Sequence, residues 1–390
     1  MVGQRSSRGR AVAIAMVIAA SAAVWTVARS DSTSPTPGSR SAPTTTAVAS
    51  DALVARARAG LAVFTSWLAR NHAVGIISEV GWPAGPDAEK WNALADAWYR
   101  DADAAKLWVT AWASGPFAPF DTHQIYAHTV SWPVGGVDRP TPQSSVVERH
   151  PSTPSYLRGV AVTGGSWGDG INDPNTFSNE QPGQYGVTYF YENEATFRYL
   201  ASRGVKLVRI DFKWERLQPV PGGPLDPNEL ARLRATVDAS AAAGLSVILD
   251  LHNYGAYQTL DGRQPIGSPG VPISAFTDLW SRISREFSSN PSVVGYGLMN
   301  EPHDVGGPRQ WERISQAAVD AIRATGDRHE IDVSGDNWSA VETWATEHPT
   351  AWIHDPLGKI RYDAHQYFDG DHTERYLFSY DTELAAALAP

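Results

Sequence analysis

The chain has 390 residues, of which 42% are hydrophobic and 19% charged, and its formal net charge is −10. This composition is typical of a soluble globular protein with an ample core, and the acidic balance argues against nucleic acid as a partner. The lack of cysteine excludes disulfides and thiolate metal sites. Fifteen Trp and fourteen Tyr suit a large core, and also a cleft that stacks flat, hydroxylated rings.

The N-terminal region has the pattern of an export segment. Three arginines within the first ten residues precede an apolar run, Ala11–Ala28, which Arg29 follows. This is the order of a signal peptide, and the run also reaches the length that spans a bilayer. Residues 1–29 are expected to be a cleaved signal or an uncleaved anchor, and the Ser/Thr/Pro-rich residues 30–50 a flexible linker. The protein is expected to be secreted, or held at the membrane by this segment alone, and monomeric.

The chain between the linker and residue 116 alternates between helix and strand. Apolar side chains recur at helical spacing over 51–71 and again over 87–105, which predicts two helices. Two short apolar runs, Val74–Trp82 and Leu107–Ser114, end at Gly and Pro and predict strands. Residues 117–155 are rich in proline and have no clear period, so they are expected to form an irregular surface connection with room for a short helix.

From residue 156 the alternation resumes and supplies six further strands. These predicted strands cover 156–162, 206–212, 245–251, 293–302, 330–335 and 360–367. The predicted helices between them lie at 192–203, 226–244, 274–289 and 311–324. Strands that alternate with helices predict a parallel sheet with right-handed crossovers. Six strands and the earlier two make eight, the number of a (β/α)₈ TIM barrel.

Two predicted strands end in a glutamate. The run Val293–Pro302, V-V-G-Y-G-L-M-N-E-P, is too apolar for an exposed edge and places Asn300 and Glu301 at its carboxyl end. The strand Val74–Trp82 places Glu79 in the same way. Parallel barrels carry their chemistry at this end. A strand-end glutamate also serves simply to cap a helix or meet solvent, so neither residue alone indicates a site.

Four segments identify a family resemblance. They are V-R-I-D-F-K-W-E-R-L-Q at 208–218, D-L-H-N-Y-G at 250–255, G-L-M-N-E-P at 297–302 and D-A-H-Q-Y-F-D at 363–369. In this order they resemble strands two, three, four and six of glycoside hydrolase family 5, the cellulase-type (β/α)₈ barrels. The resemblance covers nearly all of the chain from Asp51 to Asp369. It implies hydrolysis of O-glycosidic bonds in a polysaccharide, without a cofactor or a metal; the eleven His include no H-x-x-x-H pair.

The family's strands seven and eight do not follow His365 here. Segments that resemble them stand at the front of the chain, I-I-S-E-V-G at 76–81 and T-A-W-A-S at 110–114. We therefore predict one circularly permuted barrel over 51–390. Its parts are helix six to strand eight over 51–116, a connector over 117–155, and strands one to six over 156–390. The alternative is a broken or chimeric gene, with an unrelated front and an open six-stranded sheet.

The resemblance implies roles for the two glutamates. Glu301 corresponds to the acid/base and Glu79 to the nucleophile of a retaining double displacement, which requires carboxyls roughly 5–5.5 Å apart. Arg209, inside a predicted strand, is the natural cation for Glu79, although a plain structural ion pair would give the same contact. A separation of about 10 Å or more would instead favour a non-catalytic carbohydrate-binding barrel.

The remaining candidate residues are expected to hold the substrate or the carboxylates. By resemblance, Asn300 contacts the sugar 2-hydroxyl, the hydroxyl of Tyr367 lies near Glu79, and Trp112 forms the ring-stacking floor beside the scissile bond. Two strand-end histidines and one further tryptophan complete the set: His252, His365 and Trp338. As isolated residues, His252, His365 and Trp112 are more often explained as part of the core, and Trp338 is equally explained in that way. The expected activity is that of an endo-β-1,4-glucanase, with β-mannan or β-1,3-glucan as alternative substrates.

Overall fold

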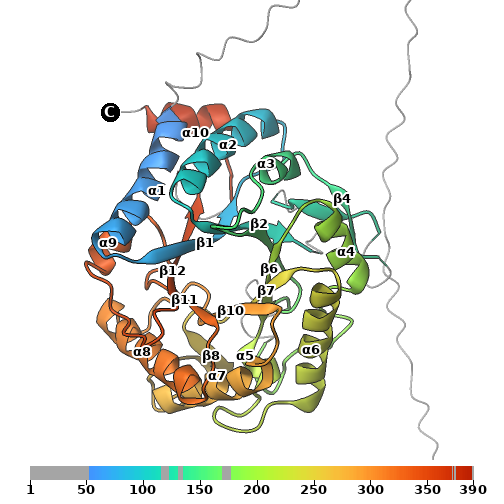
Figure 1. The fold of residues 1–390 in the computed structure, drawn as a ribbon, viewed down its shortest axis with the longest axis vertical. Helices are drawn as coiled ribbons and strands as arrows, with labels where there is room; N and C mark the ends of the chain where they lie inside the picture. The colour runs from blue at the N-terminus through green and yellow to red at the C-terminus, as the bar shows by residue number, and fades with distance from the viewer. Residues whose placement is uncertain are drawn as a thin grey trace, which may run out of the picture. The chain divides into compact units, whose positions relative to one another are not determined.

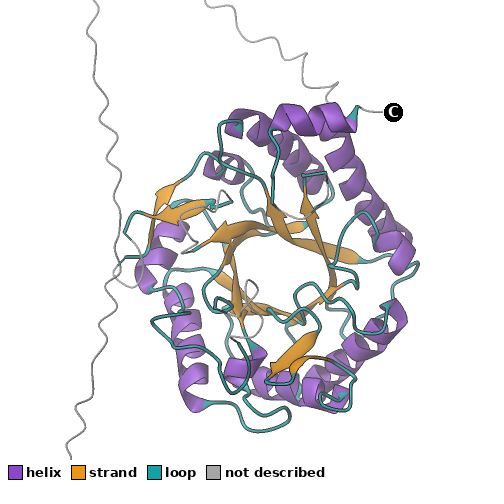
Figure 2. Ribbon diagram, turned by 180° about the vertical axis from the view of Figure 1, so that it is seen from behind, coloured by secondary structure: helices purple, strands orange, loops and turns teal. Residues whose placement is uncertain are grey.

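The structure is a computed structural model that describes residues 52–388, except 116–122, 131–134, 169–176, 371 and 373–374. The predicted signal or anchor and the linker lie outside the described residues. Figure 1 looks down a ring of strands that is surrounded by helices, and Figure 2 shows the same ring from behind.

Eight parallel strands close into a barrel, as predicted. The strands are β1 (Val74–Gly81), β2 (Trp108–Ser114), β5 (Arg158–Val162), β6 (Leu207–Phe212), β7 (Ser246–Leu251), β10 (Val293–Gly297), β11 (Glu330–Ser334) and β12 (Ile360–Tyr367). Around the ring their order is β1-β12-β11-β10-β7-β6-β5-β2, and β2 pairs with β1 to complete it. All carboxyl ends therefore meet on one face of the barrel.

The first two strands fill the gap between the last and the first of the other six. β1 pairs with β12 from Val74 opposite Arg361 to Gly81 opposite Tyr367. On its other side β1 pairs with β2, which in turn pairs with β5. The open six-stranded sheet that a broken gene would leave is therefore absent from the described chain.

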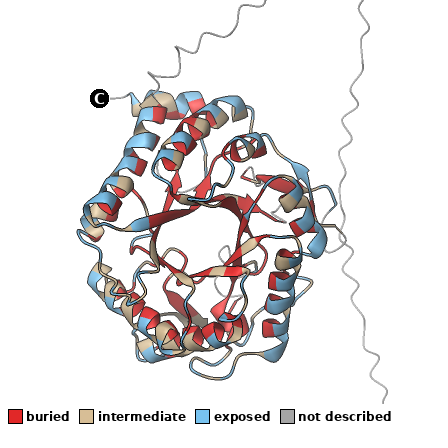
Figure 3. Cartoon of the chain, viewed as in Figure 1, coloured by how far each residue is buried: buried red, intermediate tan, exposed pale blue. Residues whose placement is uncertain are grey.

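Helices cover the outside of the barrel. The longer ones are α1 (Ala52–Arg70), α2 (Ala88–Ala104), α4 (Glu194–Ser202), α6 (Pro227–Ala242), α7 (Ile273–Phe287) and α8 (Pro308–Ala324); the shorter ones are α3 (Ser144–Arg149), α5 (Trp214–Leu217), α9 (Trp344–Glu347) and α10 (Tyr380–Ala387). Local sequence sets their starts: at α6 the Asp226 side chain accepts from two backbone amides, and Pro227 follows at the first helical position. Figure 3 shows buried strands and helices exposed only on their outer faces.

Two local predictions were wrong, and one hairpin was not predicted. The connector is not irregular throughout, because β3 (Tyr126–His128) and β4 (Val137–Pro140) form a hairpin at the edge of β2, followed by α3. At this edge a proline costs the sheet no internal hydrogen bond, so the prolines misled the prediction. A second hairpin, β8 (Ala256–Thr259) and β9 (Gly262–Pro265), follows β7. Finally, β10 ends at Gly297, before the predicted Pro302.

The first and last described helices pack against each other, as Figure 1 shows at the start of α1. Arg56 in α1 donates to the carbonyl of Phe368 at 2.8 Å and lies 3.8 Å from Glu383 in α10. Among the described residues, α1 alone is long and apolar enough to cross a membrane by length and composition. Its apolar face, which includes Phe64 and Trp67, is buried, so these criteria are met here by a helix that packs within the domain.

The inside of the barrel is mostly polar. The main apolar core lies between the strands and the helices. A small apolar cluster forms inside the ring from Ile76, Leu207 and Ile248. Buried charged residues of the barrel strands make up much of the remainder: Arg209, Asp250, Asp332 and Asp363. Buried charges require partners. Arg209 contacts Asp250 and Glu79, and Asp363 accepts from Ser78, which directly precedes Glu79.

Candidate active site

The two predicted glutamates lie together at the carboxyl face. Glu79 follows an irregularity in β1 between Ile77 and Glu79, and its side chain is buried. Glu301 comes four residues after β10 and has a left-handed backbone, with φ of 43°, a conformation that is strained for a residue with a side chain. A carboxylate oxygen of Glu79, one of Glu301 and a ring nitrogen of His365 all lie within 4.8 Å of one another. This matches the short carboxyl spacing of retaining glycosidases, roughly 5–5.5 Å, and not the spacing of roughly 6.5–9.5 Å in inverting ones.

Arg209 on β6 joins three strands. Its guanidinium donates to Glu79 Oε1 and to Asn300 Oδ1, both at 2.6 Å, and lies 2.9 Å from Asp250 Oδ1. All four side chains are buried. A charge held in such a place loses its hydration, so its fixed partners determine its position. Arg209 therefore orients one oxygen of Glu79 and the amide of Asn300.

His365 at the end of β12 bridges the two glutamates. Its Nδ1 lies 2.8 Å from Glu301 Oε1 and 3.6 Å from Glu79 Oε2. On the other side of the ring, Nε2 lies 2.9 Å from Ser78 Oγ, which donates to Asp363 Oδ2 at 2.8 Å. Burial alone would lower the pKa of His365, but the charges of Glu79 and Glu301 raise it to about 9.

The surroundings drive the two carboxyls toward different protonation states. Burial would raise the pKa of Glu79, but the charges of His365 and Arg209 outweigh it, and the pKa is lowered. The hydroxyl of Tyr367 also donates to Glu79 Oε2 at 2.8 Å. Burial and the charge of Glu79 raise the pKa of Glu301. One carboxyl is thus held as an anion while the other retains a proton more readily, which is how a nucleophile and an acid are distinguished.

His252 contacts the amide nitrogen of Asn300, whereas Arg209 contacts its amide oxygen. Its Nδ1 is 2.9 Å from Asp250 Oδ2, and its Nε2 is 3.2 Å from the Tyr254 hydroxyl and 3.3 Å from the Asn300 amide nitrogen. The ring of Trp112, from β2, stacks on His252 with centroids 5.6 Å apart and planes 8° apart. An aromatic face and several polar groups therefore border the carboxylates, an arrangement suited to a sugar ring.

Trp338 lies farther out than the other predicted residues. Its side chain is 48% exposed and stacks on His303, with ring centroids 3.9 Å apart. Tyr254 lies between it and His252, with its ring 5.9 Å from that of Trp338. Asn337, Trp338 and Ser339 all have positive φ, and the Trp338 amide donates to the carbonyl of Pro302, beside Glu301. A strained turn thus holds an exposed aromatic ring near the rim of the site.

Sequence reasoning missed four residues that hold the predicted ones: Ser78, Asp250, Tyr254 and Asp363. Three of them stand inside the motifs that carry the resemblance, D-L-H-N-Y-G and D-A-H-Q-Y-F-D, and the fourth directly precedes Glu79. The motifs therefore contained a usable signal. Each of the four residues lies one or two positions from a predicted site residue, but the prediction favoured residues at strand ends.

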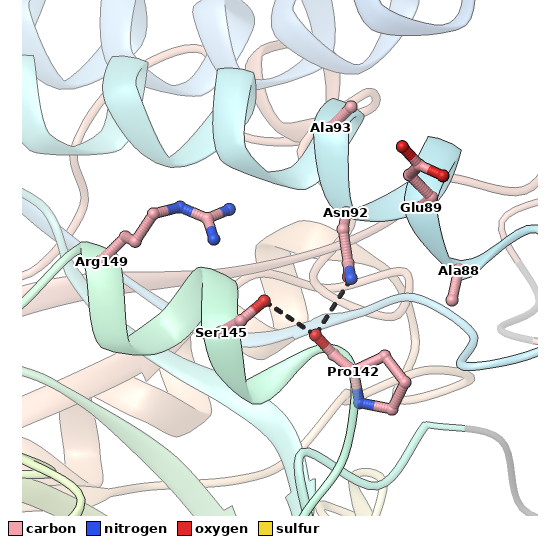
Figure 4. A pocket seen from close by; sticks show the side chains of 7 residues that line it. All are labelled: Ala88, Glu89, Asn92, Ala93, Pro142, Ser145 and Arg149. Carbon is pink, nitrogen blue, oxygen red and sulfur yellow. Dashed lines mark hydrogen bonds between the residues drawn. The ribbon is translucent and has the colours of Figure 1, made fainter. Parts of the chain in front are cut away.

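A shallow pocket of about 410 Å³ lies outside the barrel between α2 and α3. Figure 4 shows its lining, in which Asn92 and Ser145 both donate to the carbonyl of Pro142. None of the residues predicted for the site lines this pocket. The carboxyl pair therefore remains the candidate active site.

Comparison with known proteins gives several matches. The family described as cellulase, glycosyl hydrolase family 5, matches residues 168–387. A manganese dependent endoglucanase Eg5A of Phanerodontia chrysosporium is 31% identical over 244 residues, which is 60% of this chain and 57% of that protein. Endoglucanase gh5-1 of Neurospora crassa is 32% identical over 55% of this chain and 50% of its own length. The chain spans about half the length of these curated relatives.

A solved structure supports the same assignment. The endoglucanase Cel5A of Pseudomonas stutzeri, in complex with cellobiose, is 36% identical over 57% of this chain and 63% of that chain, with a TM-score of 0.52. The family match covers more than half of the described chain, and the closed eight-stranded barrel agrees with it. The chain belongs to glycosyl hydrolase family 5, the cellulase family.

Proposed function

We propose that this chain is an endo-β-1,4-glucanase that cleaves its substrate with retention of configuration. The observation that carries the proposal is the pair Glu79 and Glu301, whose oxygens lie within 4.8 Å of His365 Nδ1 and of each other and whose pKa values are displaced in opposite directions. Retaining glycosidases require one ionised and one protonated carboxyl at this spacing.

In the first step, Glu79 Oε2 attacks the anomeric carbon and forms an ester to the sugar. The bond from that carbon to the leaving oxygen breaks, and Glu301 gives its proton to that oxygen. Arg209, donating to Oε1 at 2.6 Å, and Tyr367, donating to Oε2 at 2.8 Å, keep the attacking carboxylate ionised and oriented. Asn300, held by Arg209, is placed to contact the sugar 2-hydroxyl.

In the second step, Glu301 takes a proton from water while the water oxygen attacks the anomeric carbon. The ester bond breaks, Glu79 leaves as a carboxylate, and Glu301 is again protonated, so atoms and charge balance over the cycle. His365 donates to or accepts from Glu301 Oε1 at 2.8 Å. It therefore stays within hydrogen-bonding distance of the acid/base in both of its protonation states.

The sugar chain is proposed to cross the carboxyl face from Trp112 toward Trp338. Trp112 belongs to β2, and Trp338 follows β11, three positions away around the ring. Glu79 is on β1, the neighbour of β2 in the ring, and Glu301 follows β10, the neighbour of β11. Two hydrophobic platforms on either side of the scissile bond suit an internal cut in a polymer. β-1,4-Glucan is the preferred substrate because several relatives are named endo-β-1,4-glucanases.

The test is an assay of the purified chain on soluble carboxymethyl cellulose, β-mannan and a β-1,3-glucan. We expect rapid loss of viscosity with carboxymethyl cellulose, and proton NMR of the first product should show the β-anomer before mutarotation. Preference for another polymer would correct the substrate. Tight binding without cleavage would replace the proposal with a carbohydrate-binding barrel, and the α-anomer would exclude the double displacement.

We also infer that the chain is a circular permutant of the family barrel, with the parts predicted from sequence over 51–116, 117–155 and 156–390. Three observations support this. The family match begins only at residue 168, the curated relatives are matched over about half of their length, and β1 and β2 complete the ring from outside the matched range. The contact of α1 with α10 brings the two ends of the described chain together.

A relinked variant tests the permutation. Residue 388 is joined to residue 52 by a short Gly/Ser linker, and new ends are opened within 117–122, which restores the proposed family strand order. Because the new junction joins elements that already pack together, we expect the thermal midpoint and the specific activity to stay close to those of the parent. An unfolded relinked chain, alongside a folded control with the same linker appended to residue 388 without new ends, would contradict the permutation.

A further inference from the structure

We propose that Glu79, Glu301 and His365 form a binding site for one borderline transition cation such as Zn²⁺, and that the bound cation inhibits the enzyme by competing with the substrate. The inference about binding stands on the geometry of the cluster. Its inhibitory effect rests on the proposed glucanase function.

The three side chains offer the ligand set that zinc prefers. Zinc takes carboxylate oxygen and imidazole nitrogen at about 2.0–2.2 Å, in sites with three protein ligands and one open position. Tetrahedral ligands at that distance lie roughly 3.4 Å from one another. Here His365 Nδ1 is 2.8 Å from Glu301 Oε1 and 3.6 Å from Glu79 Oε2, and all the ligand atoms fit within 4.8 Å. Small side-chain adjustments therefore suffice.

The hydrogen bonds around His365 direct the correct nitrogen toward the cation. Ser78 has one hydroxyl proton and donates it to Asp363 Oδ2 at 2.8 Å. The Ser78 oxygen can then only accept from His365 Nε2, 2.9 Å away. In the neutral ring, this places the proton on Nε2 and leaves the Nδ1 lone pair facing the two glutamates. Histidine ligands of metals are commonly oriented in this way by a partner on the second nitrogen.

The rest of the site leaves the cation accessible and limits which cation fits. Glu79 Oε1 accepts from Arg209 and Oε2 accepts from Tyr367, so Glu79 offers the cation only the remaining lone pair of Oε2, the oxygen that faces His365. The Glu301 side chain is 15% exposed, which opens the cluster toward the cleft. Calcium needs six to eight oxygen ligands, more than this cluster provides, whereas the imidazole favours Cu²⁺ and Zn²⁺ over Mn²⁺. A cation held here occupies the Glu79 oxygen that attacks the sugar and displaces the proton that Glu301 gives to the leaving oxygen.

Isothermal titration of the full chain with ZnCl₂ tests the site directly. We expect one strong Zn²⁺ site, weaker Mn²⁺ binding and no Ca²⁺ binding. His365→Gln should weaken Zn²⁺ binding at least tenfold, since it removes a ligand. Ser78→Ala keeps all three ligands but frees the His365 ring, and should weaken binding about 10–100-fold. His303→Gln, which changes the histidine stacked on Trp338, is the matched control and should bind as the parent does.

Kinetics tests the consequence. Zn²⁺ should raise KM on carboxymethyl cellulose without lowering kcat, and EDTA should reverse the effect. Equal Zn²⁺ binding by the parent, Ser78→Ala and folded His365→Gln chains would overturn the site, as would activation or non-competitive inhibition by Zn²⁺. If the chain cleaves no glycan but the binding pattern holds, the proposed function fails while the cation site stands.

Discussion

Replacing Glu79 with Gln is expected to abolish release of reducing sugar, with kcat reduced on the order of 10⁴-fold or more, because the amide is a poor nucleophile. Glu301→Gln removes proton transfer to the leaving oxygen and is expected to reduce kcat about 10²–10⁴-fold. On substrates with a good leaving group, such as aryl cellobiosides, the loss in kcat/KM for Glu301→Gln should nearly vanish, because protonation is then less needed. The loss in kcat should remain, because hydrolysis of the ester on Glu79 still lacks its general base. Rates on both substrate types, measured for each variant, check this division of roles.

Two controls make these measurements decisive. Glu330→Gln changes a glutamate of β11 at the start of the strand, away from the carboxyl face, and should leave kcat unchanged. Azide added to Glu301→Ala should restore turnover and give a β-glycosyl azide, since a small anion can attack the ester on Glu79 without a general base. Activity that survives Glu79→Gln would rule out the double displacement.

Replacing Asp332 with Asn is expected to stabilise the fold. Asp332 on β11 is 1% exposed, and neither carboxylate oxygen has a hydrogen-bond partner among the described residues. Burial, together with the charge of Asp363, raises the pKa of Asp332 well above its ordinary value. An unpartnered buried polar group costs about 1–3 kcal/mol, and more when it is charged. The amide also lacks a partner, but it is neutral without taking up a proton, so the variant should gain about 1 kcal/mol or more at neutral pH.

The pH dependence of this gain has a definite sign. Because the folded-state pKa is raised, the folded protein binds the proton more tightly than the unfolded chain, and stability falls as pH rises from about 4 toward the folded pKa. The gain from Asp332→Asn should therefore be largest above that pKa and disappear below about pH 4. Urea unfolding at a series of pH values measures it. A gain that does not vary with pH would contradict the assignment.

Asp250→Asn is the matched contrast. Asp250 is also 1% exposed inside the barrel, but it contacts Arg209 at 2.9 Å and His252 at 2.9 Å. Burial would raise the pKa of Asp250, but the charge of Arg209 and the hydrogen bond from His252 lower it. Its neutralisation should destabilise the fold, the opposite of the effect at Asp332. If both variants shifted the free energy of unfolding in the same direction, the presence or absence of a charged partner would not explain the difference between Asp250 and Asp332.

The sequence predicted the barrel well because its strands and helices carry strong local patterns. β12 occupies the predicted 360–367, and α7, Ile273–Phe287, lies close to the predicted helix over 274–289. The hairpins β3–β4 and β8–β9 were missed because their strands are three or four residues long, too short for an alternating pattern to be recognised. Proline in β4 further concealed the first of them.

The candidate site was predicted only in part, because strand-end position identifies a residue without its partners. Arg209, His365 and the two glutamates could be named, since each belongs to a strand of recognisable type. The link from Asp363 through Ser78 to His365 depends on two strands, β12 and β1, that lie at opposite ends of the sequence. The same holds for Asp332, because its lack of a hydrogen-bond partner among the described residues depends on how several strands meet in the closed ring.

The pairing of β1 with β12 has a consequence for biosynthesis. The strand that carries Glu79 is translated among the first described segments, yet one of its two neighbours in the ring is the last barrel strand to be made. Contacts between residues so far apart in sequence form slowly, because a long loop must be closed before they contribute stability. The nascent chain therefore cannot close its barrel before β12 has been made.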